Sequence, residues 1–167
     1  MHFTYCPQCG KRLIPREIGD EGMLPYCKDC RRPFWDMFAT SVICAAVNEY
    51  NEVALLRQDY VSTQNHVCVA GIIQMGETAE AAAVREIKEE IGQDVLHLTY
   101  IRSYYYEKSG MLMLGFMAEV NKTDFALSSE VDAAEWVPLS EAPNLLRKGG
   151  VAWQLVSEIA GKFEKTY

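Results

Sequence analysis

Residues 71–93 constrain the fold of this chain more than any other stretch, because they combine a glycine turn with a helix. Positions 79–91 are rich in Ala and Glu, which are good helix formers. Thr78 is placed to cap the N-terminus of this helix, and Gly92 is placed to end it. The sequence therefore predicts a short strand, a turn and a helix in succession.

The predicted helix places three carboxylates on one face. Glu86, Glu89 and Glu90 are spaced i, i+3 and i+4, so they lie one turn apart. Like charges at this spacing destabilise a helix, and a bound cation would relieve the repulsion. Oxygen ligands favour Mg²⁺ or Mn²⁺ over softer metals. The alternative interpretation is a solvated face stabilised by an ion pair between Arg85 and Glu89.

The whole stretch resembles the Nudix box, written G-x5-E-x7-R-E-U-x-E-E-x-G-U, in which U is a bulky aliphatic residue. The fixed positions are occupied by Gly71, Glu77, Arg85, Glu86, Ile87, Glu89, Glu90 and Gly92. One position departs, because the last U is Gln93, and the residue at that position ordinarily packs rather than reacts. A match of this length is far more specific than a lone glycine motif.

The resemblance implies an α/β/α sandwich with a mixed sheet that hydrolyses a nucleoside diphosphate linked to another group. It also implies a catalytic Mg²⁺ or Mn²⁺, for which the expected ligands are the carbonyl of Ala70 and the carboxylates of Glu86, Glu90 and Glu130. Arg85 is expected to orient Glu77 through an ion pair rather than to touch the substrate. The general base is left open between Glu89, Glu90 and Glu130.

Four of the six cysteines form two C-x2-C pairs, with a spacing typical of a zinc site; they are Cys6, Cys9, Cys27 and Cys30. The alternative is two disulfides or two redox pairs, but no secretion signal supports oxidation. Residues 1–36 contain few large aliphatic side chains, so a metal is expected to stabilise them as a small zinc ribbon. Four thiolates leave zinc no open position for water, so its expected role is structural.

The composition excludes several other classes of protein. The 167 residues carry a formal net charge of −7, which disfavours non-specific nucleic-acid binding. No apolar run approaches the roughly 18 residues of a transmembrane helix, so no membrane partner is expected. The N-terminus lacks a basic region followed by an apolar one, so we expect a cytoplasmic protein.

Residues 37–167 are expected to form the second domain. Strands are expected at residues 40–48, 52–58, 66–73, 95–106, 111–120 and 130–137. Helices are expected at residues 79–91, 140–147 and 151–163, and residues 59–65 are expected to form a mobile polar loop. This order predicts the α/β class, with the first helix on one face of a mixed sheet and the last helix on the other.

A zinc ribbon followed by this box resembles the NADH pyrophosphatase (NAD diphosphatase)-like group of the Nudix hydrolase superfamily, and the likeness covers nearly the whole chain. The resemblance implies cleavage of an NAD(H)-like dinucleotide, a small-molecule nucleotide substrate, into two mononucleotides by a homodimer. It places candidate substrate contacts at Trp35, Ile72, Tyr106 and Ala152.

The chain departs from that group just after the box. The group carries Ser-Gln-Pro-Trp-Pro-Phe-Pro-x-Ser there, whereas residues 103–111 read Ser-Tyr-Tyr-Tyr-Glu-Lys-Ser-Gly-Met. Two alternatives therefore stand beside NAD(H). One is a pyrophosphatase for ADP-ribose, another nucleotide sugar or FAD, and the other is a non-catalytic nucleotide-sensing module.

Overall fold

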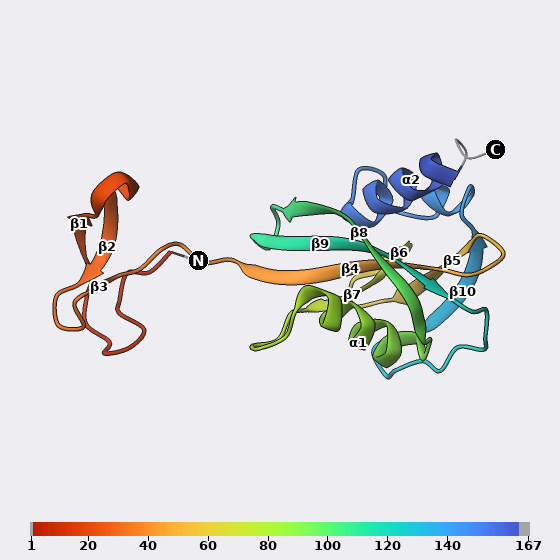
Figure 1. Cartoon of the computed structure of the whole chain (residues 1–167), viewed down its shortest axis with the longest axis horizontal. Coiled ribbons are helices and arrows are strands. Elements are labelled where there is room, and N and C mark those ends of the chain that lie inside the picture. The colour runs from red at the N-terminus through yellow and green to blue at the C-terminus, as the bar shows by residue number, and fades with distance from the viewer. Residues whose placement is uncertain (1, 164–167) are drawn as a thin grey trace. The chain divides into compact units, whose positions relative to one another are not determined.

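The chain divides between Ala39 and Thr40 into two compact units. The computed structural model describes residues 2–163 (Figure 1). The sequence places the domain boundary close by, between residues 36 and 37. No helix among the described residues has the length and apolar character that a membrane crossing needs.

The first unit is a small antiparallel sheet. Its strands are β1 (Ile14–Glu17), β2 (Met23–Cys27) and β3 (Arg32–Pro33), in the order β1-β2-β3, with a short 3-10 turn η1 (Gly19–Glu21) between the first two. Its buried apolar cluster consists of Cys6, Leu13, Cys27 and Phe34. Two of these four side chains are themselves cysteines, so the unit has little hydrophobic core of its own.

The second unit is built on a sheet of seven strands among the described residues. These are β4 (Ala39–Val47), β5 (Glu52–Gln58), β6 (Ser62–Val67), β7 (Val69–Ile72), β8 (Val95–Tyr106), β9 (Met111–Val120) and β10 (Ala133–Pro138). The main order is β10-β5-β4-β9-β8, with β6 paired to β5 and β7 paired to β4. The pairs of β4 with β5 and with β7 are antiparallel, whereas β4 and β9 run in the same direction in Figure 1, so the sheet is mixed.

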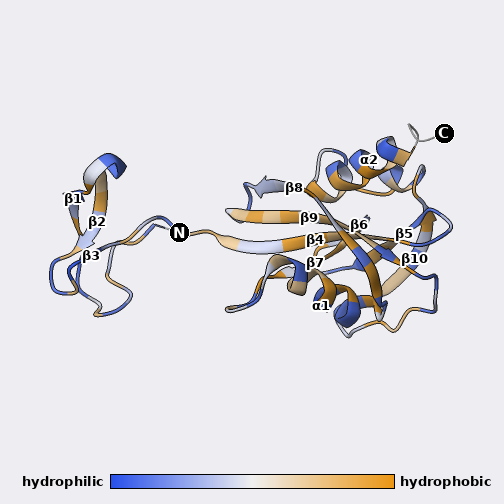
Figure 2. Cartoon of the chain, in the orientation of Figure 1, coloured by the Kyte–Doolittle hydropathy of each residue, from blue (hydrophilic) through white to orange (hydrophobic). Residues whose placement is uncertain are grey.

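Two helices cover opposite faces of this sheet (Figure 1). They are α1 (Ala79–Ile91) and α2 (Val151–Phe163). Successive residues of a strand point to opposite faces, and β4 shows this alternation directly. Val42, Cys44 and Ala46 belong to the cluster that contains α1, whereas Ile43, Ala45 and Val47 belong to the cluster that contains α2. Figure 2 shows apolar residues along the central strands. The predicted α/β/α sandwich is therefore confirmed.

The expected helices at residues 79–91 and 151–163 and the strands at 52–58, 95–106 and 111–120 are confirmed. Four expectations are wrong. Part of the predicted loop at 59–65 belongs to β6, which forms a hairpin with β5, and the predicted strand at 66–73 is divided between β6 and β7. The last strand begins at Ala133 rather than Glu130, because residues 129 and 130 form a turn closed by the Val131 amide on the Ser128 carbonyl, 3.3 Å away.

The fourth correction concerns residues 140–147, which form only the 3-10 turn η2 (Ala142–Asn144) instead of a helix. The backbone beyond this turn pairs with β6. The Leu145 carbonyl accepts a hydrogen bond from the His66 amide at 3.1 Å, and Leu146 forms a parallel bridge with His66. The backbone at the end of this segment therefore pairs with β6 instead of forming the hydrogen bonds of the expected helix.

Candidate active site

Helix α1 is positioned by its two ends and by its apolar face. The Thr78 hydroxyl accepts a hydrogen bond from the Ala81 amide at 3.2 Å, and Gly92 ends the helix in the left-handed conformation with φ of 74°. Both capping predictions are confirmed. Ile87 and Ile91 are fully buried against the sheet. The helix is therefore fixed in its rotation about its own axis.

Gly71 allows β7 to lie directly against a carboxylate of this helix. A Cβ atom at Gly71 would lie 1.9 Å from the Cδ atom of Glu86, far inside van der Waals contact. The backbone of Gly71 has no unusual conformation, so glycine is required here because of the close approach. The first glycine of the box thus makes room for the Glu86 carboxylate.

Arg85 forms the ion pair with Glu77 that the resemblance implies. Its Nε and Nη2 atoms donate to the two carboxylate oxygens of Glu77 at 2.8 and 2.9 Å. Its Nη1 atom donates to Glu86 at 2.7 Å and to Glu89 at 3.0 Å, so the alternative Arg85–Glu89 pair is also present. The Arg85 hydrogen bonds lower the pKa of Glu77 to about 2. This guanidinium is committed to carboxylates of its own chain.

Glu90 is the buried carboxylate of the cluster, with 5% of its surface exposed. Burial raises its pKa to about 8, and the neighbouring Glu86 charge adds to the shift. The Gln58 side-chain amide donates to Glu90 at 3.4 Å. A buried carboxylate repelled by a second one is stabilised by a divalent cation between them. Oxygen donors of this kind fit Mg²⁺ or Mn²⁺.

These groups meet in one cleft of about 470 Å³. Its lining residues come from β7, α1, the β5–β6 connection and the loop before β10; they are Tyr60, Ala70, Gly71, Ile72, Arg85, Glu86, Glu89, Glu90, Ser128, Ser129 and Glu130. The expected Mg²⁺ or Mn²⁺ ligands Ala70, Glu86, Glu90 and Glu130 are thus brought together. Glu130 is separated from α1 by two strands in the sequence and reaches the cleft from residues 121–132.

The four candidate substrate residues lie in different parts of the chain's structure. Ile72 lines the cleft and is half exposed. Tyr106 ends β8, paired with Met111, and Ala152 lies in the first turn of α2, partly buried against the core, so neither lines this cleft. Trp35 is half exposed in the first unit. A substrate contact at these three residues stays a prediction.

Tyr60, Ser128, Ser129 and Gln58 are site residues that the sequence pattern does not identify. Tyr60 and the two serines line the cleft, and Gln58 contacts Glu90 from the end of β5. None belongs to a spaced motif, and each arrives through tertiary folding of a loop or strand end. The polar composition of residues 59–65 and 121–129 is the one signal that marks these segments as surface loops.

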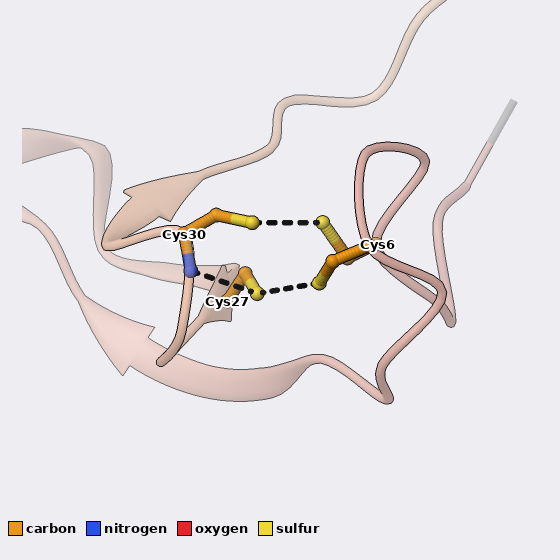
Figure 3. A group of neighbouring side chains, drawn as sticks. Cys6, Cys27 and Cys30 are labelled. Atoms are coloured by element: carbon orange, nitrogen blue, oxygen red, sulfur yellow. Dashed lines mark hydrogen bonds between the residues drawn. The ribbon is translucent and has the colours of Figure 1, made fainter.

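The four predicted zinc ligands also come together, within the first unit. Their four Sγ atoms lie within 4.8 Å of one another, with Cys6 to Cys30 at 3.8 Å and Cys9 to Cys27 at 3.6 Å (Figure 3). Zinc–sulfur bonds of about 2.3 Å in a tetrahedron place sulfur atoms about 3.8 Å apart. The donor set therefore fits one zinc ion.

Each cysteine pair lies in a hydrogen-bonded turn, and the two turns share one backbone feature. The Gly10 amide donates to the Cys6 carbonyl at 2.8 Å, and the Cys30 amide donates to Cys27 Sγ at 3.4 Å. The residue after the second cysteine has positive φ in both turns, 72° at Gly10 and 53° at Arg31. The two halves of the sulfur cluster are thus built alike, although only the first uses glycine.

Comparison with known proteins extends over both units. A family model described as NUDIX domain matches residues 37–158. A protein of Escherichia coli O157:H7 named NAD-capped RNA hydrolase NudC is 30% identical over 164 residues, covering 98% of this chain and 62% of that protein. A protein of the same name from Vibrio atlanticus is 28% identical, covering 98% of this chain and 60% of that protein. The chain spans about 60% of the length of these curated relatives.

Solved structures share the fold at lower identity. A NUDIX hydrolase from Nitrosomonas europaea has a TM-score of 0.73 at 20% identity, covering 98% of this chain and 93% of that one. The NUDIX domain of Shewanella oneidensis NrtR, solved with ADP ribose, has a TM-score of 0.62 at 12% identity, covering 85% of this chain and 94% of that one. These likenesses show the architecture alone.

Proposed function

We propose that this chain, which belongs to the NUDIX family, is a metal-dependent pyrophosphohydrolase that splits an NAD(H)-like dinucleotide into two mononucleotides. The observation that carries the proposal is the meeting of Glu86, Glu90 and Glu130 with Ala70 in one cleft. The names of the relatives, which match 98% of this chain, support an NAD-containing substrate.

The expected cofactor is Mg²⁺ or Mn²⁺, held by the carboxylates of Glu86, Glu90 and Glu130 and by the carbonyl of Ala70. When bound, such an ion neutralises phosphate charge and lowers the pKa of a coordinated water. Without such an ion, the carboxylates of the cleft would repel the negatively charged phosphates of the substrate. Arg85 contributes by holding Glu77, Glu86 and Glu89 in place.

In the proposed reaction, a water oxygen bonds to one phosphorus of the pyrophosphate, and the bond from that phosphorus to the bridging oxygen breaks. The leaving mononucleotide keeps the bridging oxygen and the electron pair. The proton of the water passes to a carboxylate of the cleft. Glu89, Glu90 and Glu130 all line the cleft and remain the candidates for this base. The pH–rate profiles of E89Q, E90Q and E130Q distinguish them.

The first test is a product-release assay with Mg²⁺ and with Mn²⁺ on NADH, NAD⁺, ADP-ribose, FAD, a UDP-sugar and NAD-capped RNA. Glu90→Gln is expected to lower turnover by orders of magnitude with the fold intact. Glu80→Gln makes the same chemical change in the exposed first turn of α1 and is the matched control. Near-normal turnover by E90Q with a full metal complement contradicts the assignment.

The substrate panel decides between the candidate activities. Preference for NADH, with NMNH and AMP as products, supports the proposal without the Trp-Pro-Phe-Pro signature. Preference for ADP-ribose, FAD or a UDP-sugar would mean that the chain catalyses the same hydrolysis and that its pocket for the substrate's base has been rebuilt. Absence of turnover on every substrate supports the nucleotide-sensing alternative.

We also propose that the cysteine cluster holds a structural Zn²⁺ and that the protein is a cytoplasmic homodimer. The sulfur geometry supports zinc. Homodimers are the commonest oligomers, and sedimentation of the purified full chain tests this state.

A further inference from the structure

The segment that brings Glu130 to the cleft is a long connection without helix or strand. It runs over residues 121–132, between β9 and β10. Loops of this length inside a compact domain are uncommon and are often functional. A carboxylate at the end of such a loop is useful as a ligand only when the loop is held in place.

Gln93 contacts this loop from just beyond the C-terminus of α1. Its side chain is almost fully buried, with 2% of the residue exposed. Its Nε2 atom donates to the Asp124 carbonyl at 3.2 Å and to the Ile91 carbonyl at 3.3 Å. Its Oε1 atom accepts a hydrogen bond from the Thr123 hydroxyl at 2.7 Å. An aliphatic residue, as the box pattern has at this position, makes none of these bonds.

The loop is also paired with the backbone at the end of the helix. The Ala126 amide donates to the Ile91 carbonyl and the Ser128 amide to the Glu90 carbonyl, both at 3.2 Å. Carbonyls in the last turn of a helix have no partner within the helix. A Cβ atom at Gly92 would lie 2.6 Å from the Ala126 Cβ, so the loop lies directly against the helix end.

The geometry points to Gln93 as a positioning residue that fixes the 121–132 loop through Thr123 and Asp124, so that Glu130 faces Glu86 and Glu90. This inference rests on the proposed function, in which Glu130 is a metal ligand. The hydrogen bonds of Gln93 link the end of α1, the helix that carries two of the proposed ligands, to the loop that carries the third. The departure from the box pattern thus has a specific consequence for the site.

A second contact keeps the loop folded when Gln93 is replaced. Phe125 stacks on Trp136 of β10 with ring centroids 4.9 Å apart, and the Trp136 indole donates to the Thr123 carbonyl at 3.5 Å. Replacing Gln93 is therefore expected to loosen the placement of Glu130 while the loop stays attached to β10.

The experiment measures Mn²⁺ binding by the purified full chain with zinc retained, using wild type, Q93L, E130Q and the double variant. E130Q is expected to weaken Mn²⁺ binding by about tenfold, and Q93L to produce a large part of that loss. The double variant is expected to be no weaker than E130Q alone, because Gln93 acts through Glu130. Additive losses, or unchanged binding by Q93L, overturn the inference.

Two further variants separate positioning from general destabilisation. Val156→Ala opens a cavity in the core on the α2 face and is expected to lower stability without weakening Mn²⁺ binding. Equal weakening by V156A and Q93L overturns the inference. Thr123→Val is expected to reproduce part of the Q93L loss, and Thr123→Ser, which keeps the hydroxyl, is expected to bind Mn²⁺ as wild type does.

The same measurements separate this inference from the proposed function. If E130Q weakens Mn²⁺ binding and Q93L does not, the positioning role is wrong and the proposed function stands. If E130Q changes neither Mn²⁺ binding nor turnover, Glu130 is not a ligand, and both the assignment of this ligand and the role of Gln93 are wrong.

Discussion

The first unit buries a cluster of four side chains, two of them cysteines, whereas the second unit buries a separate apolar cluster on each face of its sheet. The proposed metal ligands lie differently in the two units. Two of the four cysteines of the ribbon, Cys6 and Cys27, belong to its small buried cluster, whereas the carboxylates of the cleft are not members of the apolar clusters of the second unit.

The two proposed metal roles agree with this difference in core size. Where little apolar surface is buried, ligand bonds have to supply the folding free energy. Where burial is sufficient, charged ligands that destabilise the fold are tolerated, and an ion bound to them is available for chemistry.

The largest effect is expected from removing zinc from the ribbon. Cys27→Ser with Cys30→Ser in the full chain should unfold residues 1–36, because structural zinc contributes about 10–16 kcal/mol in small domains. The second unit should remain folded. Two-dimensional NMR resolves the two units, and persistence of dispersed ribbon signals in the variant would contradict the contrast.

The next effect is expected at Glu90, with opposite signs for activity and stability. E90Q should lose turnover by orders of magnitude, yet the protein without Mg²⁺ or Mn²⁺ should be more stable than wild type at high pH. The pKa of Glu90 is raised from 4.5 to about 8, so the folded state binds this proton more tightly than the unfolded state does. The stability of wild type therefore falls as pH rises between these values.

Urea denaturation of wild type and E90Q at pH 5 and pH 9 measures this difference, with zinc retained. A lower stability of E90Q at pH 9 would mean that the carboxylate holds the fold, as the thiolates do in the ribbon.

A smaller effect is expected from Gly71→Ala. The added methyl would meet the Glu86 carboxyl at 1.9 Å, so either this side chain or β7 has to move. We expect a loss of kcat/KM of at least tenfold, on the order of 1.4 kcal/mol in transition-state stabilisation. Gly161→Ala, where a Cβ meets nothing within 4 Å in α2, is the matched control. Equal kinetics of the two variants would exclude a close approach at Gly71.

The smallest effect concerns the acid stability contributed by Glu77. Its pKa is lowered from 4.5 to about 2, so its contribution is present above pH 4.5 and is lost as pH falls toward 2. Melting temperatures of wild type and E77Q should therefore converge over this range. If the difference in melting temperature between the two proteins stays constant with pH, protonation of Glu77 is not linked to folding.

Local rules predicted much of this fold because they act over short distances. The caps at Thr78 and Gly92 and the apolar spacing of α2 depend on neighbouring residues only. The 140–147 segment failed because its backbone pairs with β6, which is distant in the sequence. The carboxylates of α1 were found through the box spacing, and Glu130 was found through the wider family resemblance. Tyr60 lines the cleft from a loop and Gln58 contacts Glu90 from a strand end, and neither segment carries a motif.

The commitment of Arg85 to Glu77, Glu86, Glu89 and the Ile72 carbonyl has a kinetic consequence. Among the described residues lining the cleft, it is the one cationic side chain, and its hydrogen bonds are already used within the chain. In the proposed reaction, a divalent ion would therefore have to supply the positive charge that the phosphates need, and the velocity would depend on the concentration of the free ion.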